Sequence, residues 1–418
     1  MSPEKSPDTC CPDGLAATRR GFLRGAALAG ATTVIGTTVV TTTSSPAAAA
    51  TAPSVLVVVS LRGAADGLSL VVPHGDPAYY AARPKIAVPK EQLLAADGFF
   101  GLHPALAPLV PLWTAGRIAA VQATGLPVAN RSHFAAMEEL EDADPGSSAR
   151  VGWLNRMIGA DAPVGDDVQG LVVGSKLPTS MLGPETVMSF RSLDSATVAG
   201  VDKLGNAGPR MRSLHSGWDR AGTDMAVGMR TALGAVTDLA SAKAQEDRVA
   251  SYPQTDLGKS LASVARTLRA DIGVTAVTVD TQSWDMHTSI GTPTSGWMVR
   301  NAADLAGSIA SFFTDLGPVA DRVTLVTISE FGRRVQENAN QGLDHGWGNV
   351  MLLAGAGVKG GAYYGSWPGL ANTLDADLAV TTDYRSVLAE VVAARTTASV
   401  ATVFPGFQRE RVGVMLGQ

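Results

Sequence analysis

Three short segments of this chain combine carboxylate and imidazole side chains, the residue types that bind cations and transfer protons. They are Trp284-Asp285-Met286-His287, Ser329-Glu330-Phe331-Gly332-Arg333 and Asp344-His345-Gly346-Trp347-Gly348. Each lies directly after or just before a run of Val, Ile, Leu and Thr that is typical of a buried strand. Side chains at strand ends can converge on one point, as they do in the metal and catalytic sites of open α/β sheets.

Asp285 and His287 form the clearest candidate metal pair. Residues two apart in an extended chain point the same way, so a carboxylate and an imidazole could bind one cation. Asp280, at the end of the preceding strand, is a competing ligand. Asp344 and His345 follow in a glycine-flanked loop, which is typical either of a site that needs close backbone approach or of a solvated turn.

Glu330 and Ser132 each allow two interpretations. Glu330 ends a strand and could bind a metal, or form a structural ion pair with Arg333 or Arg334. Ser132 precedes a helix predicted over 134–140, where a serine could cap the helix or act as a nucleophile beside the positive helix end. Residues 51–418 contain neither the G-x-S-x-G nor the S-x-x-K motif of serine hydrolases.

The elements that must position these residues alternate between strands and helices. Strands are predicted over 55–61, 118–123, 168–173, 187–190, 274–279, 323–328 and 350–353, and helices over 104–115, 134–140, 225–244, 260–270, 300–313 and 384–393. This order predicts an α/β fold with a doubly wound, mostly parallel sheet flanked by helices and a site at the strand C-terminal ends. The region 160–255 could be an inserted cap.

Residues 1–50 have the features of a twin-arginine signal peptide. Arg19-Arg20 is followed by a mildly apolar run and then by the small residues Ala47-Ala48-Ala49-Ala50. The run is too weakly hydrophobic for a good membrane anchor, so we expect no stable span after processing. The sequence predicts an exported protein, extracellular or in the periplasm or cell envelope, with residues 51–418 as its domain.

Composition excludes several kinds of site. Both cysteines, Cys10 and Cys11, lie in the leader, so the domain would have no disulfide, thiolate metal site or cysteine nucleophile. The chain has a formal net charge of −5 and no basic stripe, which argues against nucleic acid as a partner.

Several motifs together resemble a family of exported bacterial proteins defined as a domain of unknown function, number fifteen hundred and one. The resemblance extends from about Val55 to the C-terminus. Besides the three segments above, it rests on Leu61-Arg62-Gly63-Ala64-Ala65-Asp66-Gly67-Leu68, Gly101-Leu102-His103-Pro104-Ala105-Leu106 and Asn130-Arg131-Ser132-His133-Phe134. That family in turn resembles the alkaline phosphatase and sulfatase superfamily.

The resemblance implies an alkaline-phosphatase-like fold with metals at the strand ends. It implies that Asp66 is the metal aspartate after the first strand and that Ser132 is the nucleophile. Asp285 and His287 resemble the acid-and-imidazole pair of one metal site, and His345 the last metal histidine. Glu330 falls where the superfamily usually has Asp-His.

One departure affects the metals that the resemblance implies. Phe331 stands where a second-site histidine is expected. One site, with Asp285, His287 and His345, would favour zinc, and the other, with Asp66 and Glu330, would favour calcium, magnesium, manganese or no metal. An alternative alignment makes Asp344-His345 the second-site pair.

These observations lead to two main hypotheses of function. In the first, a metal-dependent hydrolase cleaves phosphate or sulfate esters of an anionic small molecule or polymer: Ser132 attacks, and Arg333 or His133 binds the non-bridging oxygens. In the second, a non-catalytic exported protein keeps the fold and binds a metal or a partner. A third hypothesis, a carbohydrate hydrolase using Glu138, Glu139, Glu141 or Asp142, has less support, because an acidic run on a helix is typical of a solvated face.

Overall fold

A large mixed β-sheet forms the centre of the molecule. The structure, a computed structural model, describes residues 31–35, 38–42, 53–144, 147, 149–161, 169–174, 176–197 and 208–418. Within these residues the sheet is 11-stranded, in the order β1-β2-β8-β7-β9-β3-β10-β11-β6-β12, and β13 pairs with β6. A separate small sheet pairs β4 with β5. The strands are β1 (Ala31–Ile35), β2 (Thr38–Thr42), β3 (Val55–Leu61), β4 (Val71–Val72), β5 (Gly101–Leu102), β6 (Ile118–Gly125), β7 (Gly170–Val173), β8 (Val187–Phe190), β9 (Ala276–Thr281), β10 (Val323–Ile328), β11 (Asn349–Gly355), β12 (Tyr363–Tyr364) and β13 (Thr382–Asp383).

The direction of the strands brings the chemistry-bearing segments to one edge of the sheet. β8, β7, β9, β3 and β10 run parallel to one another. β11 lies antiparallel between β10 and β6, so β6 runs in the same direction as β10. The C-terminal ends of β3, β6, β9 and β10 and the first residue of β11 therefore share one edge.

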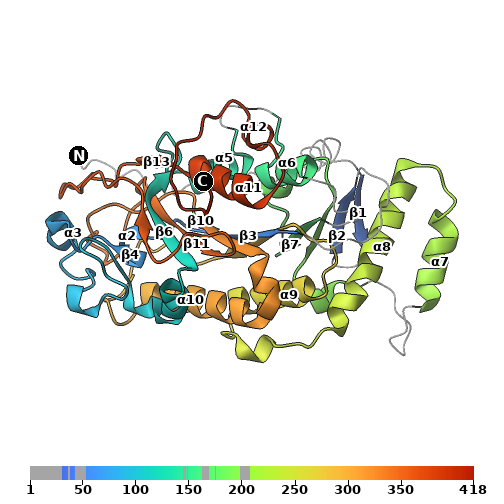
Figure 1. The fold of residues 1–418 in the computed structure, drawn as a ribbon, viewed down its shortest axis with the longest axis horizontal. Helices are drawn as coiled ribbons and strands as arrows, with labels where there is room; N and C mark the ends of the chain where they lie inside the picture. Colours follow the sequence, from blue (N-terminus) through green and yellow to red (C-terminus); the bar gives the residue numbers. More distant parts are fainter. Residues whose placement is uncertain are drawn as a thin grey trace, which may run out of the picture.

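Helices cover both faces of the sheet (Figure 1). One apolar core joins Val57 and Val59 of β3 to side chains of α9 and α10, and the other joins Val58 of β3 to side chains of α5, α6 and α11. Because both faces are covered, the central strands are mostly apolar, and every residue of β3 and β10 is buried.

The helical elements are mostly short. The α-helices are α2 (Gly67–Leu70), α3 (Pro77–Ala82), α4 (Val110–Thr114), α5 (His133–Asp142), α6 (Trp153–Ala160), α7 (Gly208–Trp218), α8 (Asp224–Ala244), α9 (Asp256–Arg269), α10 (Trp297–Leu316), α11 (Tyr384–Arg395) and α12 (Val400–Val403). The 3-10 helices are η1 (Lys90–Gln92), η2 (Pro104–Leu109), η3 (Thr179–Met181), η4 (Leu193–Ser195), η5 (Val249–Ser251) and η6 (Gly317–Asp321).

The predicted α/β fold, with a mostly parallel sheet flanked by helices, is confirmed. The predicted bounds of β8 and β10 agree with the structure. The single helix expected over 104–115 is instead η2 followed by α4, because Pro108 and Pro111 lack the N–H groups that a continuous α-helix needs. The expected cap region, 160–255, contains α7 and α8 but also β7 and β8, which belong to the main sheet.

Part of the expected leader also lies in the sheet. β1 and β2 form an antiparallel pair, and β2 pairs with β8. Arg19-Arg20 and Ala47-Ala48-Ala49-Ala50 lie outside the described residues, so the signal peptide and its export route stay predictions. Across the part of the chain that the structure describes, no helix combines the length and apolar character needed to cross a bilayer.

Candidate metal centre

Four side chains from separate segments converge at the shared edge of the sheet. His133 is the first residue of α5, which follows β6, and Asp285 and His287 follow β9. His345 comes shortly before β11. Each of the four offers one ligand atom, and these atoms all lie within 4.8 Å of one another.

The Nε2 atoms of the three imidazoles face one another. His345 Nε2 lies 2.9 Å from His133 Nε2 and 2.8 Å from His287 Nε2. Oδ1 of Asp285 lies 3.2 Å from His287 Nε2, 3.6 Å from His133 Nε2 and 3.8 Å from His345 Nε2. Three nitrogen atoms and one oxygen atom therefore surround a single point.

Each imidazole is oriented by a hydrogen-bond acceptor behind its other nitrogen. Nδ1 of His133 lies 2.8 Å from Oε1 of Glu330, and Nδ1 of His287 lies 3.1 Å from Oδ1 of Asp344. Nδ1 of His345 lies 2.9 Å from the carbonyl oxygen of Arg131. Ionised carboxylates and carbonyl oxygens only accept, so all three Nδ1 atoms must carry the proton. This arrangement is typical of histidines that bind metals.

The charge states of the two acceptor carboxylates support this assignment. Burial alone would raise the pKa of Glu330, but hydrogen bonds from His133 and from backbone N–H groups outweigh it and lower the pKa. Burial also acts to raise the pKa of Asp344, and the hydrogen bonds from Asn338 and His287 lower it overall. Both groups therefore stay ionised near neutral pH and remain acceptors.

The donor set fits a zinc ion. With every Nδ1 protonated, the Nε2 atoms of neutral imidazoles present lone pairs to one another at 2.8 and 2.9 Å. A proton can join only one such pair, whereas a cation at the centre can bind all of them. Zinc binds imidazole nitrogen at about 2.0–2.1 Å in tetrahedral sites, which places neighbouring nitrogens about 3.3 Å apart. Small ring movements would convert the observed cluster to that geometry.

Arg333 holds Asp285 in place. It is 1 % exposed and donates to Oδ1 of Asp285 at 2.7 Å. Its other hydrogen bonds go to backbone carbonyls of Gly63, Ala64, Trp284 and Leu343, and its Nη1 also lies 3.5 Å from Nε2 of His287. Burial acts to raise the pKa of Asp285, but Arg333 outweighs it and the pKa is lowered. All N–H groups of the Arg333 side chain are engaged in this way. Arg333 therefore supports Asp285, and it has no N–H group left to bind a substrate.

The turn after β3 contacts both Glu330, which lies behind His133, and Arg333, which lies beside Asp285. Gly63 donates its N–H to Glu330 at 2.8 Å and accepts from Arg333 through its carbonyl oxygen. Its φ is +104°, and an added Cβ would lie 2.6 Å from the backbone nitrogen of Asp285. A glycine is therefore required here, both for the backbone conformation and for the close approach.

Phe331 packs against two of the ligand rings. Its ring centroid lies 4.9 Å from that of His133 and 4.9 Å from that of His345. The residue that departs from the superfamily pattern thus supplies an apolar wall, which excludes water from one side of the cluster.

The structure brings together most of the residues that the sequence singled out, in partly different roles. Asp285, His287 and His345 meet as expected. His133, predicted to be catalytic, is the third imidazole of the cluster that could hold a metal. Glu330 and Asp344, predicted to be ligands, contact the Nδ1 atoms of His133 and His287 in the structure.

Asp66 lies apart from the cluster. It is fully buried, and both of its carboxylate oxygens accept from Arg83, at 2.5 and 2.9 Å. Glu330 meanwhile contacts His133. Asp66 and Glu330, expected to share a second metal site, thus have different partners in the structure, and Arg83 supplies the positive charge that balances Asp66. Among the described residues, the four-residue cluster is the one group of donors that could hold a metal.

Ser132 stands at the start of α5, directly before a ligand. It is the N-cap residue, as predicted, but its hydroxyl makes no capping hydrogen bond, and the residue is exposed. Arg131, one residue earlier, supplies the carbonyl oxygen that orients His345.

Sequence reasoning missed the role of Arg83 and the place of His133 among the candidate metal ligands. The signal for His133 was available, since it follows β6 at the same edge of the sheet as the other two histidines. Arg83 carried no comparable signal, because it lies between a short helix and a loop.

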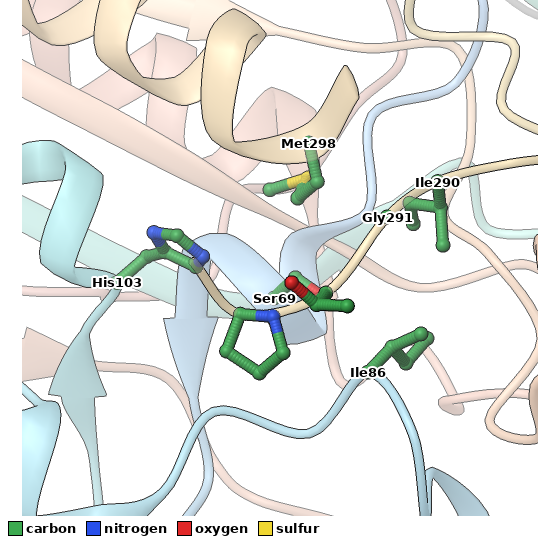
Figure 2. Close-up of a pocket in the computed structure, with 8 residues that line it drawn as sticks. Ser69, Ile86, His103, Ile290, Gly291 and Met298 are labelled. Atoms are coloured by element: carbon green, nitrogen blue, oxygen red, sulfur yellow. The ribbon is translucent and has the colours of Figure 1, made fainter. Parts of the chain in front are cut away.

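A small pocket lies beside the Asp66–Arg83 pair rather than at the cluster. It is lined by Ser69, Ile86, His103, Ile290, Gly291, Thr292, Pro293 and Met298, and none of these is a candidate ligand. Figure 2 shows Met298 above Ser69, with His103 on one side and Ile290 and Gly291 on the other. His103 caps η2 by accepting from the N–H of Ala105, and burial lowers its pKa to about 4.

Comparison with known proteins identifies the family. The family model described as "Protein of unknown function (DUF1501)" matches residues 108–394. The chain belongs to this family. No curated protein matches the sequence.

One solved structure with similarity to this DUF1501 protein is the PsFucS1 sulfatase from Pseudoalteromonas sp. The TM-score is 0.31 and the sequence identity 10%, over 74% of this chain and 64% of the sulfatase chain. The DUF1501 chain thus spans less than two thirds of the sulfatase. A TM-score and a sequence identity this low give no information about the chemistry of this chain.

We expect Glu330→Gln to weaken metal binding by this DUF1501 protein by roughly 10- to 100-fold, the range for a partner that orients a metal-binding histidine. The amide can present its NH₂ group to Nδ1 of His133, which removes the acceptor that fixes the protonation of the ring. A zinc competition titration against a chromophoric chelator would measure the change. Glu337→Gln is the control, because Glu337 accepts only from backbone N–H groups of Lys85 and Ile86. Equal zinc affinity of Glu330→Gln and the wild type would contradict the assigned role of Glu330.

Proposed function

We propose that this DUF1501 protein is an exported, metal-dependent hydrolase of phosphate or sulfate esters, with zinc at the cluster and Ser132 as the nucleophile. The observation that carries the proposal is the convergence of three imidazole Nε2 atoms and Asp285 Oδ1, each imidazole having an acceptor behind its Nδ1. The proposed export rests on the Arg19-Arg20 pattern.

His133, His287, His345 and Asp285 would hold the ion. A zinc ion supplies Lewis acidity, which lowers the pKa of a hydroxyl or water molecule near it and polarises an ester oxygen. Asp285 is the ligand best placed to yield a coordination position, because its side chain is 50% exposed and Arg333 already balances its charge.

Ser132 would attack the phosphorus or sulfur atom of the ester through its Oγ. Oγ gives up its proton to solvent, its new bond forms as the bond to the ester oxygen breaks, and the alcohol leaves with a proton from solvent. A water molecule then attacks the same atom, which releases phosphate or sulfate and regenerates the serine hydroxyl. Two observations support this role: Oγ makes no capping hydrogen bond, and the N-terminus of α5 favours negative charge beside it.

Arg333 would contribute by position rather than by contact with the substrate. Its hydrogen bonds to Asp285 and to backbone carbonyls of Gly63, Ala64, Trp284 and Leu343 fix the ligand that faces solvent. This replaces the role expected from the sequence, in which Arg333 or His133 binds the non-bridging oxygens.

We expect Ser132→Ala to lower turnover of aryl phosphate or aryl sulfate esters by roughly 10⁶-fold, as for loss of a serine nucleophile that acts together with its activating group. Zinc affinity should stay unchanged, because Ser132 is not a ligand. The matched control is Ser399→Ala, since Ser399 is also an exposed N-cap residue without a capping hydrogen bond, at α12. Equal turnover in wild type and Ser132→Ala would contradict the nucleophile assignment.

A second candidate function is binding without catalysis. Four protein donors would complete a tetrahedral zinc site, and sites closed in this way are structural rather than catalytic. The two candidates differ in a measurable way. Zinc-loaded protein that turns over no aryl ester and whose zinc resists exchange would favour a structural metal.

A further inference from the structure

Asn338 lies between the two segments that carry His287 and His345. It belongs to the loop that joins β10 to β11, and the side-chain amide uses both of its polar atoms. Nδ2 donates to Oδ1 of Asp344 at 2.9 Å and to the carbonyl oxygen of His287 at 3.0 Å. Oδ1 accepts from the N–H groups of Asn340 and Gly342, both at 3.0 Å. Asn338 therefore ties the His287 backbone to the loop that leads to His345.

Asp344 depends on Asn338 for its orientation. The Asp344 side chain is 58% exposed, so water competes for its oxygen atoms. The atom that accepts from Nδ1 of His287, Oδ1, is the same atom that accepts from Asn338. A second donor on this oxygen restricts rotation of the carboxylate, and an oriented carboxylate fixes the direction of the imidazole.

The backbone contacts of the same loop reinforce this arrangement. Leu343 donates its N–H to the carbonyl oxygen of Met286 at 3.0 Å. Gly342 packs so closely that an added Cβ would lie 2.2 Å from the His287 carbonyl group. Asn338 supplies two acceptor contacts that hold this tight turn, so the loop and the His287 segment behave as one unit.

We propose that Asn338 is a positioning residue that sets the metal affinity of the cluster by fixing Asp344 against His287. The inference rests on the metal centre of the proposed function and does not require catalysis. Loss of the amide donor leaves Asp344 free to turn into solvent, and His287 then loses the acceptor that directs its Nε2 toward the ion.

Two substitutions at Asn338 test the proposal. Asn338→Asp keeps the shape but removes the donor, and Asn338→Ala removes the donor without adding charge. We expect both to weaken zinc binding by roughly 10- to 100-fold in competition titrations against a chromophoric chelator. Asn340→Asp is the control, because it adds the same charge two residues away at an exposed position, where salt screens it.

The possible outcomes separate the inference from the proposed function. Wild-type protein without zinc affinity would overturn both. Equal zinc affinity in the wild type and Asn338→Ala would overturn the inference alone. Weaker binding in Asn338→Asp but not in Asn338→Ala would also overturn it, because the loss would then come from repulsion between the new carboxylate and Asp344. Thermal melting of the metal-free variants identifies general unfolding. If a variant unfolds, the test becomes the ¹⁵N chemical shifts of the His287 ring in Asn338→Ser. We expect these shifts to differ from those of the wild type, and unchanged shifts would overturn the positioning role of Asn338.

Discussion

Replacing His345 by alanine is expected to remove high-affinity metal binding. Nε2 of His345 contacts Nε2 of both His133 and His287, at 2.9 and 2.8 Å, so the substitution deletes the central donor. Loss of a ligand should weaken zinc binding by more than roughly 100-fold, which is the upper end of the range for losing a residue that only orients a ligand. Zinc content after dialysis, measured by mass spectrometry of the metal, and a competition titration would both show the loss.

A histidine outside the cluster provides the control for His345→Ala. His215 lies on α7, where its ring contacts Asp219 one helical turn away. His215→Ala should keep the zinc content of the wild type. Equal zinc affinity in His345→Ala and His215→Ala would show that zinc, if bound, is held elsewhere in the chain.

Replacing Arg83 by methionine is expected to destabilise the fold by about 3–5 kcal/mol, the cost of leaving one charge of a buried ion pair unpaired. The side chains of Arg83 and Asp66 are both fully buried. Arg83 also donates to Ser69 and to the backbone carbonyls of Arg334 and Val335. Chemical denaturation with urea would measure the change in free energy of unfolding.

The double variant Asp66→Leu with Arg83→Met separates charge from packing. Removing both charges should recover part of the lost stability, because no unpaired carboxylate stays buried. Zinc affinity of the double variant should match that of the wild type, since Asp66 is not a ligand in the structure. A large loss of zinc affinity would contradict this and restore Asp66 to the metal site that the sequence predicted.

The sequence was a good guide to the sheet and to the place of the site. The runs at 55–61, 187–190 and 323–328 are apolar because both faces of the sheet are covered, and this pattern is visible without a structure. The position of Asp285, His287 and His345 follows from strand direction, since each lies at a strand end on the same edge.

The roles of the remaining residues depend on side-chain contacts that sequence spacing does not encode. Asp66 follows β3 at the expected place, yet Arg83, seventeen positions later, turns back onto it. Glu330 lies close to the cluster, but it contacts Nδ1 of His133 rather than the centre. A position at the end of a strand thus predicts that a residue lies near the site. Whether that residue contacts the centre of the cluster, orients another side chain or forms an ion pair depends on which of its atoms points toward the centre.

Both the proposed function and the role of Asn338 require that His133, His287, His345 and Asp285 bind one cation together. X-ray absorption spectroscopy of zinc-loaded protein tests it most directly, because it measures the number, type and distance of the atoms bound to zinc. We predict one zinc per chain with three imidazole nitrogens at about 2.0–2.1 Å and one or more oxygens in a tetrahedral site. Absence of bound zinc, or an all-oxygen environment, would contradict the account.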